Sequence, residues 1–205
     1  DWLGELPAHI GSFHPGQLVE LLRYQFDARC NWKLFVENHV DVYHLWYLHA
    51  RTLADYDHRV FEWRQLGPNW VSYEPIRTGV VRHRPHVSSR QIAHLDERDR
   101  VGIGAHAAFP NILMATEAEF FITYVALPVA PDQTIIDLRI RAEPDSDPQA
   151  LFAGAEAFIA EDIAACEGVQ ASVRSSRFSV GALASEHERP IEHFHRNLLH
   201  RLGEL

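Results

Sequence analysis

The segment that most constrains the fold is residues 107–142, where three strand-like runs follow one another with only short turns between them. In the last run, 134–142, aliphatic side chains alternate with mostly charged ones, a period of two that is typical of a strand buried on one side. The apolar face of this run consists of Ile136, Leu138 and Ile140. Consecutive strands with such short connections indicate an antiparallel sheet.

The helices expected from the sequence lie outside this strand region, and this separation indicates the α+β class. Their expected ranges are 31–47, 148–168 and 185–202. The second helix is predicted to begin with Asp147 as N-cap and Pro148 in its first position. The third is predicted to begin with a capping box of Ser185 and Glu188. Strands are expected at 18–29, 59–64, 70–73, 79–84, 107–115, 119–127, 134–142 and 177–180.

Composition and charge restrict the function of the chain. Its 205 residues, 46% hydrophobic and 23% charged, suit a single globular domain with a sizeable core. The net charge of −9 argues against nucleic acid as a partner, because phosphate contact needs a basic surface. The chain has no run of 18 apolar residues and no signal sequence, so we expect no membrane contact. With only Cys30 and Cys166, we expect a cytoplasmic location and two small buried side chains rather than a disulfide.

Two polar stretches each allow two interpretations. Residues 77–90 contain four arginines, which we expect on a solvated strand and loop; a docking patch for an acidic electron carrier is the alternative. Residues 87–104 are polar and charged, which predicts a mobile surface connection, with a lid over a pocket as a further role.

The stretch 31–49 places polar groups among apolar ones. The polar residues that stand out within it are Glu37, Asn38, Asp41, His44 and His49, which fall within thirteen positions. Buried polar groups need partners, and a metal ion is one such partner. Two imidazoles and one carboxylate on one side of an ion form the facial triad of non-haem iron(II) oxygenases.

The spacing within this stretch supports a metal site in part. On a helix, Glu37, Asp41 and His44 share one face, whereas His49 lies about 140° round from His44. We therefore expect either that the helix ends between the two histidines or that it carries a π-type bulge. On spacing alone, the alternative that both are ordinary helix histidines with hydrogen-bonded neighbours stays open.

A third candidate ligand is Asp162, which falls near the centre of the apolar face of the helix expected at 148–168. Its neighbour Glu161 falls well outside that face. A carboxylate in a buried stripe needs a cation or several donors. A metal held together with the two histidines would meet this need, and so would a salt bridge to Arg174 or Arg177.

These residues form motifs that resemble a known family, the catalytic domain of Rieske-type ring-hydroxylating oxygenases, large (alpha) subunit. The resemblance covers nearly the whole chain. The motifs are Asn31-Trp32-Lys33, Glu37-Asn38, Asp41-x-x-His44-x4-His49, Phe109-Pro110-Asn111, Glu161-Asp162-x4-Glu167-x2-Gln170 and His193-Phe194-His195.

The resemblance implies a fold and a set of site residues. The fold is the helix-grip (START-like, Bet v 1-like) fold, a curved antiparallel sheet closed against a long helix. His44, His49 and Asp162 would bind one iron(II), and Asn38 would lie near it. Asp41 would bridge to a Rieske cluster on a neighbouring subunit and would also orient His44. His193 and His195 are not expected to form a second metal site, because helix residues two apart point about 200° apart.

The resemblance also implies an activity and partners. The chain would use dioxygen and Rieske electrons to hydroxylate or dihydroxylate an aromatic substrate; oxidation of a quaternary amine is the alternative. A ferredoxin or reductase, a homotrimer and an optional beta subunit would be the partners. The C-x-H and C-x2-H pairs that bind a Rieske [2Fe-2S] cluster are absent, so we expect the cluster domain N-terminal of residue 1.

Two rival functions use the same residues. A zinc hydrolase would bind its metal through the same two histidines and one aspartate, and a non-catalytic ligand-binding module of the same fold would need no metal. For the substrate pocket, the sequence suggests the strand region 107–114. It also suggests three aromatic side chains, Phe109, Phe121 and Phe158.

Overall fold

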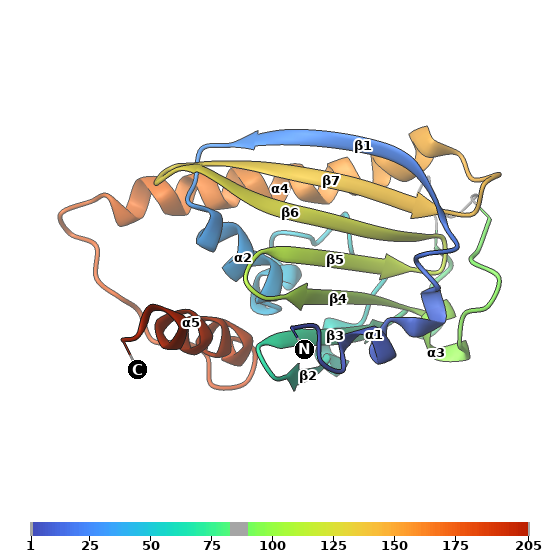
Figure 1. The fold of residues 1–205 in the computed structure, drawn as a ribbon, viewed down its shortest axis with the longest axis horizontal. Helices are drawn as coiled ribbons and strands as arrows, with labels where there is room; N and C mark the ends of the chain where they lie inside the picture. The colour runs from blue at the N-terminus through green and yellow to red at the C-terminus, as the bar shows by residue number, and fades with distance from the viewer. Residues whose placement is uncertain (1, 83–89, 205) are drawn as a thin grey trace.

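The computed structural model describes residues 2–82 and 90–204. A single seven-stranded antiparallel sheet with the order β1-β7-β6-β5-β4-β3-β2 forms the body of the chain, and the long helix α4 runs along its back (Figure 1). The strands are β1 (Val19–Ala28), β2 (Glu62–Leu66), β3 (Asn69–Pro75), β4 (Gly102–Ala108), β5 (Ile112–Glu117), β6 (Phe120–Ala130) and β7 (Gln133–Ala142). The α-helices are α1 (Leu6–His9), α2 (Trp32–Val40), α3 (Glu97–Arg100), α4 (Pro148–Val173) and α5 (Arg189–Leu202). This helix-grip arrangement confirms the predicted fold class.

The main core lies between the sheet and α4. In β7, Ile136, Leu138 and Ile140 are fully buried, as their alternation predicted. They pair across the β6–β7 hairpin with the buried residues Ala126, Tyr124 and Ile122. A second, smaller core covers the other face of the sheet and contains Leu6, Phe13, Val71, Met114 and Phe121. The two cores explain why the central strands are buried on both faces.

The run predicted as one strand at 107–115 is two strands. β4 and β5 are separated by the turn at residues 109–111, and they pair antiparallel with Ala107 opposite Leu113. The prediction was wrong because Pro110 has no N–H to donate to a ladder, which makes a strand interior unfavourable at that point. Asn111 stabilises the turn by donating from Nδ2 to the carbonyl oxygen of Ala126, at 2.9 Å.

The polar segment after residue 89 packs on the sheet more than predicted. Ile92 and Leu95 are buried, and β4 already begins at Gly102. The expected strand at 79–84 is absent over residues 79–82. The rest of that prediction, and the first residues of the connection predicted at 87–104, fall within 83–89, which lie outside the described residues. Arg82 is not solvated: its guanidinium is buried and pairs with Glu117 at 2.9 Å and with Glu119 at 2.6 Å.

Helix boundaries agree in part with prediction. Asp147 caps α4 by accepting from the N–H groups of Gln149 and Ala150, as expected, but the helix continues past residue 168 to Val173. The predicted capping box of Ser185 was wrong, because α5 begins only at Arg189, where Pro190 suits the first turn. Residues 177–180 form no strand.

Two further predictions concern the cysteines and the membrane. Cys30 and Cys166 are free thiols, and both are buried as expected. Within residues 2–82 and 90–204, the structure contains no helix with the length and apolar character needed to cross a membrane.

Candidate metal centre

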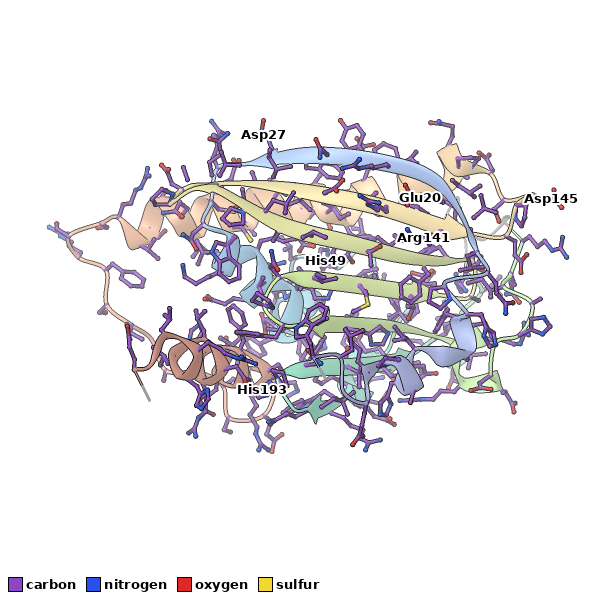
Figure 2. The ribbon with its side chains drawn as sticks, in the orientation of Figure 1. Glu20, Asp27, His49, Arg141, Asp145 and His193 are labelled. Atoms are coloured by element: carbon purple, nitrogen blue, oxygen red, sulfur yellow. The ribbon has the colours of Figure 1, made fainter. Side chains whose placement is uncertain are left out.

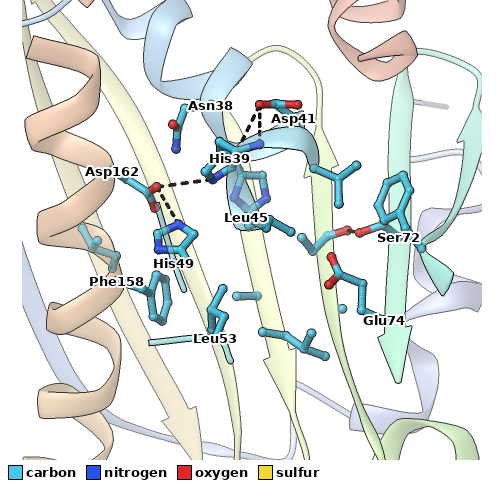
Figure 3. A pocket seen from close by; sticks show the side chains of 18 of the residues that line it. Asn38, His39, Asp41, Leu45, His49, Leu53, Ser72, Glu74, Phe158 and Asp162 are labelled. Carbon is cyan, nitrogen blue, oxygen red and sulfur yellow. Dashed lines mark hydrogen bonds and ion pairs between the residues drawn. The ribbon is translucent and has the colours of Figure 1, made fainter. Parts of the chain in front are cut away.

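The structure brings His44, His49 and Asp162 together at one point between the sheet and α4 (Figure 3). The Nε2 atoms of His49 and His44 lie 2.9 Å and 3.6 Å from Oδ1 of Asp162. Two atoms that each lie about 2.1 Å from a metal ion, at angles of 90–110°, are about 3.0–3.4 Å apart. One ligand atom from each of the three residues lies within 4.8 Å of the others. The arrangement therefore fits a single metal ion bound by two nitrogens and one oxygen.

Each imidazole is held by a carboxylate on its other nitrogen. Nδ1 of His44 lies 3.2 Å from Oδ2 of Asp41, and Nδ1 of His49 lies 2.8 Å from Oε2 of Glu161. With Nδ1–H donating to these oxygens, each Nε2 keeps its lone pair for the metal. Histidine ligands in metalloproteins are commonly oriented in this way. The predicted role of Asp41 toward His44 thus has the geometry it requires.

The backbone that carries the histidines differs from prediction. α2 ends at Val40, before both histidines, and His44 lies in a short 3-10 turn, Tyr43–Trp46. The carboxylate of Asp41 accepts from the N–H groups of Tyr43, at 2.7 Å, and His44, at 3.1 Å. Such local bonds compete with the helix and end it. No π-type bulge is needed, because both histidines lie beyond the end of α2.

Glu161 is the functional candidate that sequence reasoning missed. It was set aside because it lies outside the apolar face of α4, yet it binds His49 and accepts from Oγ1 of Thr52 at 2.7 Å. The carboxylate is 31% exposed, so it lies at the edge of the core, although the helical position predicted it well outside the apolar face. Its only signal in the sequence was that it precedes Asp162 in the second motif.

The second motif also positions α2 against α4. Oε1 of Gln170 accepts from the backbone N–H of Asn31 at 2.8 Å, and Glu167 pairs with Arg29 at 3.0 Å. Asn31 is in turn the N-cap of α2, accepting from the N–H of Lys33. The first residues of α2 are therefore attached to the helix that carries Asp162.

Electrostatics at the centre favour a bound cation. Burial lowers the pKa of His44, but hydrogen bonds to Asp162 and Asp41 outweigh it and raise this pKa to about 9. Burial raises the pKa of Asp162, but hydrogen bonds from His44 and His49 hold it below the ordinary range. Without a metal, the site gathers positive charge from protons. Iron(II) or zinc would supply that charge instead.

Several predicted residues have other positions. Asn38 lines the cavity beside the triad without being part of it. Of the aromatic candidates, Phe158 lines the cavity, whereas Phe109 and Phe121 pack in the cores and no part of 107–114 reaches it. Asp162 is not bound to Arg174, which pairs with Asp132.

Two histidines near the C-terminus point to different partners, as predicted. Nε2 of His193 lies 2.9 Å from the carbonyl oxygen of Gly67, and Nε2 of His195 lies 2.9 Å from Oε1 of Glu37. In Figure 2, His193 lies at the periphery while His49 lies behind the central strands. The pair therefore does not form a metal site.

A cavity opens beside the triad and has a volume of about 70 Å³. His39 lies in its wall, and burial lowers its pKa to about 4, so this imidazole is neutral at pH 7. Burial also raises the pKa of Tyr124 in the same wall. The aromatic residues of the lining are Phe35, Phe61, Trp70, Tyr124 and Phe158.

A second hollow lies on the outer side of the centre. The exposed Tyr47 and Ile191 of α5 line this outer hollow. Asp41 and His44 line both the outer hollow and the inner cavity. Asp41 thus lies between the metal centre and the surface of the chain. This is the position that a bridge to a neighbouring subunit would need.

Comparison with known families identifies the chain. Residues 14–204 match the model described as ring hydroxylating alpha subunit (catalytic domain). The chain belongs to this family. Choline monooxygenase, chloroplastic, from Arabidopsis thaliana is 25% identical over 98% of the chain and 47% of its own length. The Spinacia oleracea protein of the same name is 26% identical over 95% of the chain and 43% of its own length. The chain therefore spans about half the length of these relatives.

Solved structures show the same fold at low sequence identity. A quaternary ammonium Rieske monooxygenase, CntA, has a TM-score of 0.78 at 14% identity, with 98% of this chain and 55% of that chain covered. Naphthalene 1,2-dioxygenase from Rhodococcus sp. has a TM-score of 0.68 at 13% identity, with 97% and 61% covered. Both confirm the fold that the sequence motifs implied.

Proposed function

We propose that this chain is the iron-binding catalytic domain of an oxygenase that oxidises a small quaternary amine, with electrons delivered from a Rieske [2Fe-2S] cluster outside this chain. The observation that carries the proposal is the convergence of three ligand atoms, with each imidazole held by its own carboxylate. Membership of the family makes iron the expected metal.

His44, His49 and Asp162 would hold the metal on one side only. Iron(II) bound in this way supplies open positions for activating dioxygen. Asp41 and Glu161 keep the Nδ1 protons in place, which maintains Nε2 as the ligand atom on both rings. Phe158 packs against His49 with ring centroids 6.3 Å apart and helps to exclude water from the centre.

We propose a quaternary amine in place of the aromatic substrate expected from the sequence, and the cavity is compatible with it. The volume of about 70 Å³ has room for about five to seven water-sized groups, since one water needs roughly 10–15 Å³. Aromatic side chains line the space, and such faces bind quaternary ammonium groups. The names of the curated relatives and of the CntA structure point to the same substrate class. Substrate is therefore the main point on which we depart from the sequence-based expectation.

Asp41 is proposed as the route by which electrons enter. It contacts His44 and also lines the outer hollow, so a cluster domain docked there would be one hydrogen-bonded side chain from a ligand. A homotrimer in which a neighbouring subunit provides that cluster follows from this role. The ferredoxin or reductase, a beta subunit and the cytoplasmic location stay predictions.

The test is the metal content of the full-length protein, purified without oxygen, beside His44→Ala, His49→Ala and Asp162→Ala. We expect about one iron per chain, lost in all three variants, and dioxygen-dependent consumption of choline or carnitine. Consumption of naphthalene or benzoate instead would support the aromatic substrate expected from the sequence. Zinc, with activity that needs no dioxygen, would indicate the hydrolase. A protein that takes up no metal would indicate a ligand-binding module.

A further inference from the structure

A buried carboxylate that plays no part in holding the metal centre lies in the wall of the cavity. Glu74 is 5% exposed and projects from β3 into the space that the triad borders (Figure 3). Because side chains alternate along a strand, Trp70, Ser72 and Glu74 share one face of β3. All three line the cavity.

The carboxylate is held from outside the cavity. Oε2 of Glu74 makes a hydrogen bond with Nδ1 of His58, a buried residue that does not itself line the space. The His58 ring is packed in turn against Trp46, with centroids 6.1 Å apart. This support fixes the orientation of Glu74 without filling the cavity.

Apart from its three histidines, His39, His44 and His49, the ionisable acid and base groups that decide the charge of the lining are carboxylates. Among its described residues are three carboxylates, those of Asp41, Glu74 and Asp162, and no lysine or arginine. Asp162 faces His44 and His49, and Asp41 faces His44, so both are committed to the metal centre. Glu74 is the carboxylate of the lining whose partner, His58, lies outside the cavity.

A second polar group in the same wall lacks a partner. Nε1 of Trp70 is buried and has no hydrogen-bond acceptor among the described residues. Leaving a buried donor unsatisfied is unfavourable, so native structures rarely do so without a reason. An acceptor oxygen on a bound ligand would satisfy this N–H. It would lie on the same strand face as the carboxylate.

We propose that Glu74 binds the cationic group of the substrate, and that the indole N–H of Trp70 donates to an oxygen on the same molecule. The inference rests on the proposed function and names the feature of that site which selects a cation. It predicts a preference for small ammonium compounds that carry a hydroxyl or carboxylate oxygen. Neutral molecules of the same shape should bind more weakly.

The experiment compares choline with 3,3-dimethylbutan-1-ol, its neutral isostere, by calorimetry on the iron-loaded full-length protein without dioxygen. The wild type should bind choline about 10- to 100-fold more tightly than the isostere, because the attraction between the two charges is partly offset by the cost of desolvating them. Glu74→Gln, which can still contact His58, should lose most of this preference, since only the aromatic lining would still favour the cation, and should keep its affinity for the isostere. That retained affinity shows that the variant is folded.

The matched control is Glu62→Gln, the same change on the neighbouring strand β2, where the carboxylate is exposed and pairs with Arg98. It should keep the preference for choline. If Glu74→Gln also keeps that preference, the role of Glu74 is wrong while a cationic substrate stands. If the wild type binds the isostere as well as choline, the cationic substrate itself is wrong, and this inference falls with it.

Discussion

Replacing Glu161 by Gln is expected to weaken iron(II) binding by about tenfold, although Glu161 is not itself a metal ligand. Oε2 of Glu161 lies 2.8 Å from Nδ1 of His49, and this charged acceptor increases the basicity of the Nε2 that faces the metal. A hydrogen bond to a charged partner contributes about 1 kcal/mol more than a neutral one. Because the carboxylate is 31% exposed, we take the lower end of the 10- to 100-fold range seen for such partners.

The assay is competition with a chelator under anaerobic conditions, with cobalt(II) as an oxygen-stable stand-in for iron(II). Glu167→Gln is the matched control. It removes a carboxylate from the same helix, but this carboxylate pairs with Arg29 and not with a metal-binding histidine. It should leave the metal affinity within about twofold of the wild type. Equal affinities in Glu161→Gln and the wild type, with binding abolished in Asp162→Ala, would refute the reasoning.

Three further predictions concern stability and electron transfer. Burial lowers the pKa of His106 to about 3, so only the unfolded chain protonates this imidazole as the pH falls from 7 to 5. The free energy of unfolding should therefore fall by about 2 kcal/mol on account of this group. His106→Gln should remove this contribution, measured by urea unfolding at both pH values. Leu138→Ala should cost about 2–5 kcal/mol in the same assay, because the side chain is fully buried; a smaller loss would mean the core relaxes around it. Asp41→Asn should bind iron about tenfold more weakly, by the argument given for Glu161, and with iron in excess it should still lose turnover with the reductase, measured by stopped-flow; unchanged turnover of the iron-loaded variant would exclude the bridge.

Strands β6 and β7 and the start of α4 follow from local chemistry and could be predicted. The alternation in β7 needs only a sheet with one apolar face, and Asp147-Pro148 is a helix start in any context. The hairpin between β4 and β5 was within reach as well, since Pro110 interrupts the apolar run. The prediction of a single strand at 107–115 failed because it followed the hydrophobic run and ignored that Pro110 has no N–H.

The backbone around the metal ligands could not be predicted from periodicity. A helical pattern runs through residues 31–47, yet Asp41 ends the helix because its carboxylate accepts from the N–H groups of Tyr43 and His44. Whether such a side chain turns to its own backbone depends on what else it can bind. Here His44 lies beside it, so one carboxylate serves both the turn and the imidazole.

Glu161 shows why a helical wheel misses such partners. The wheel separates side chains that face the core from all others, and it assumes that the others are exposed to solvent. His49 arrives from a separate segment beside α4, so a residue at the margin of the apolar face reaches its Nδ1 while Asp162 reaches its Nε2. Two adjacent carboxylates therefore hold the two nitrogens of one ring, an arrangement that only tertiary structure creates.

The long second motif makes sense when its residues are viewed along α4. Asp162 and Gln170 are eight residues apart, so they lie just over two turns from each other and about 80° apart around the helix. Asp162 faces the metal centre, while Gln170 holds the backbone of Asn31 at the start of α2. Because α2 leads directly to the turn at Asp41, this contact sets where His44 can lie relative to Asp162. The geometry of the centre is thus determined by the pairing of two helices as much as by its three ligands.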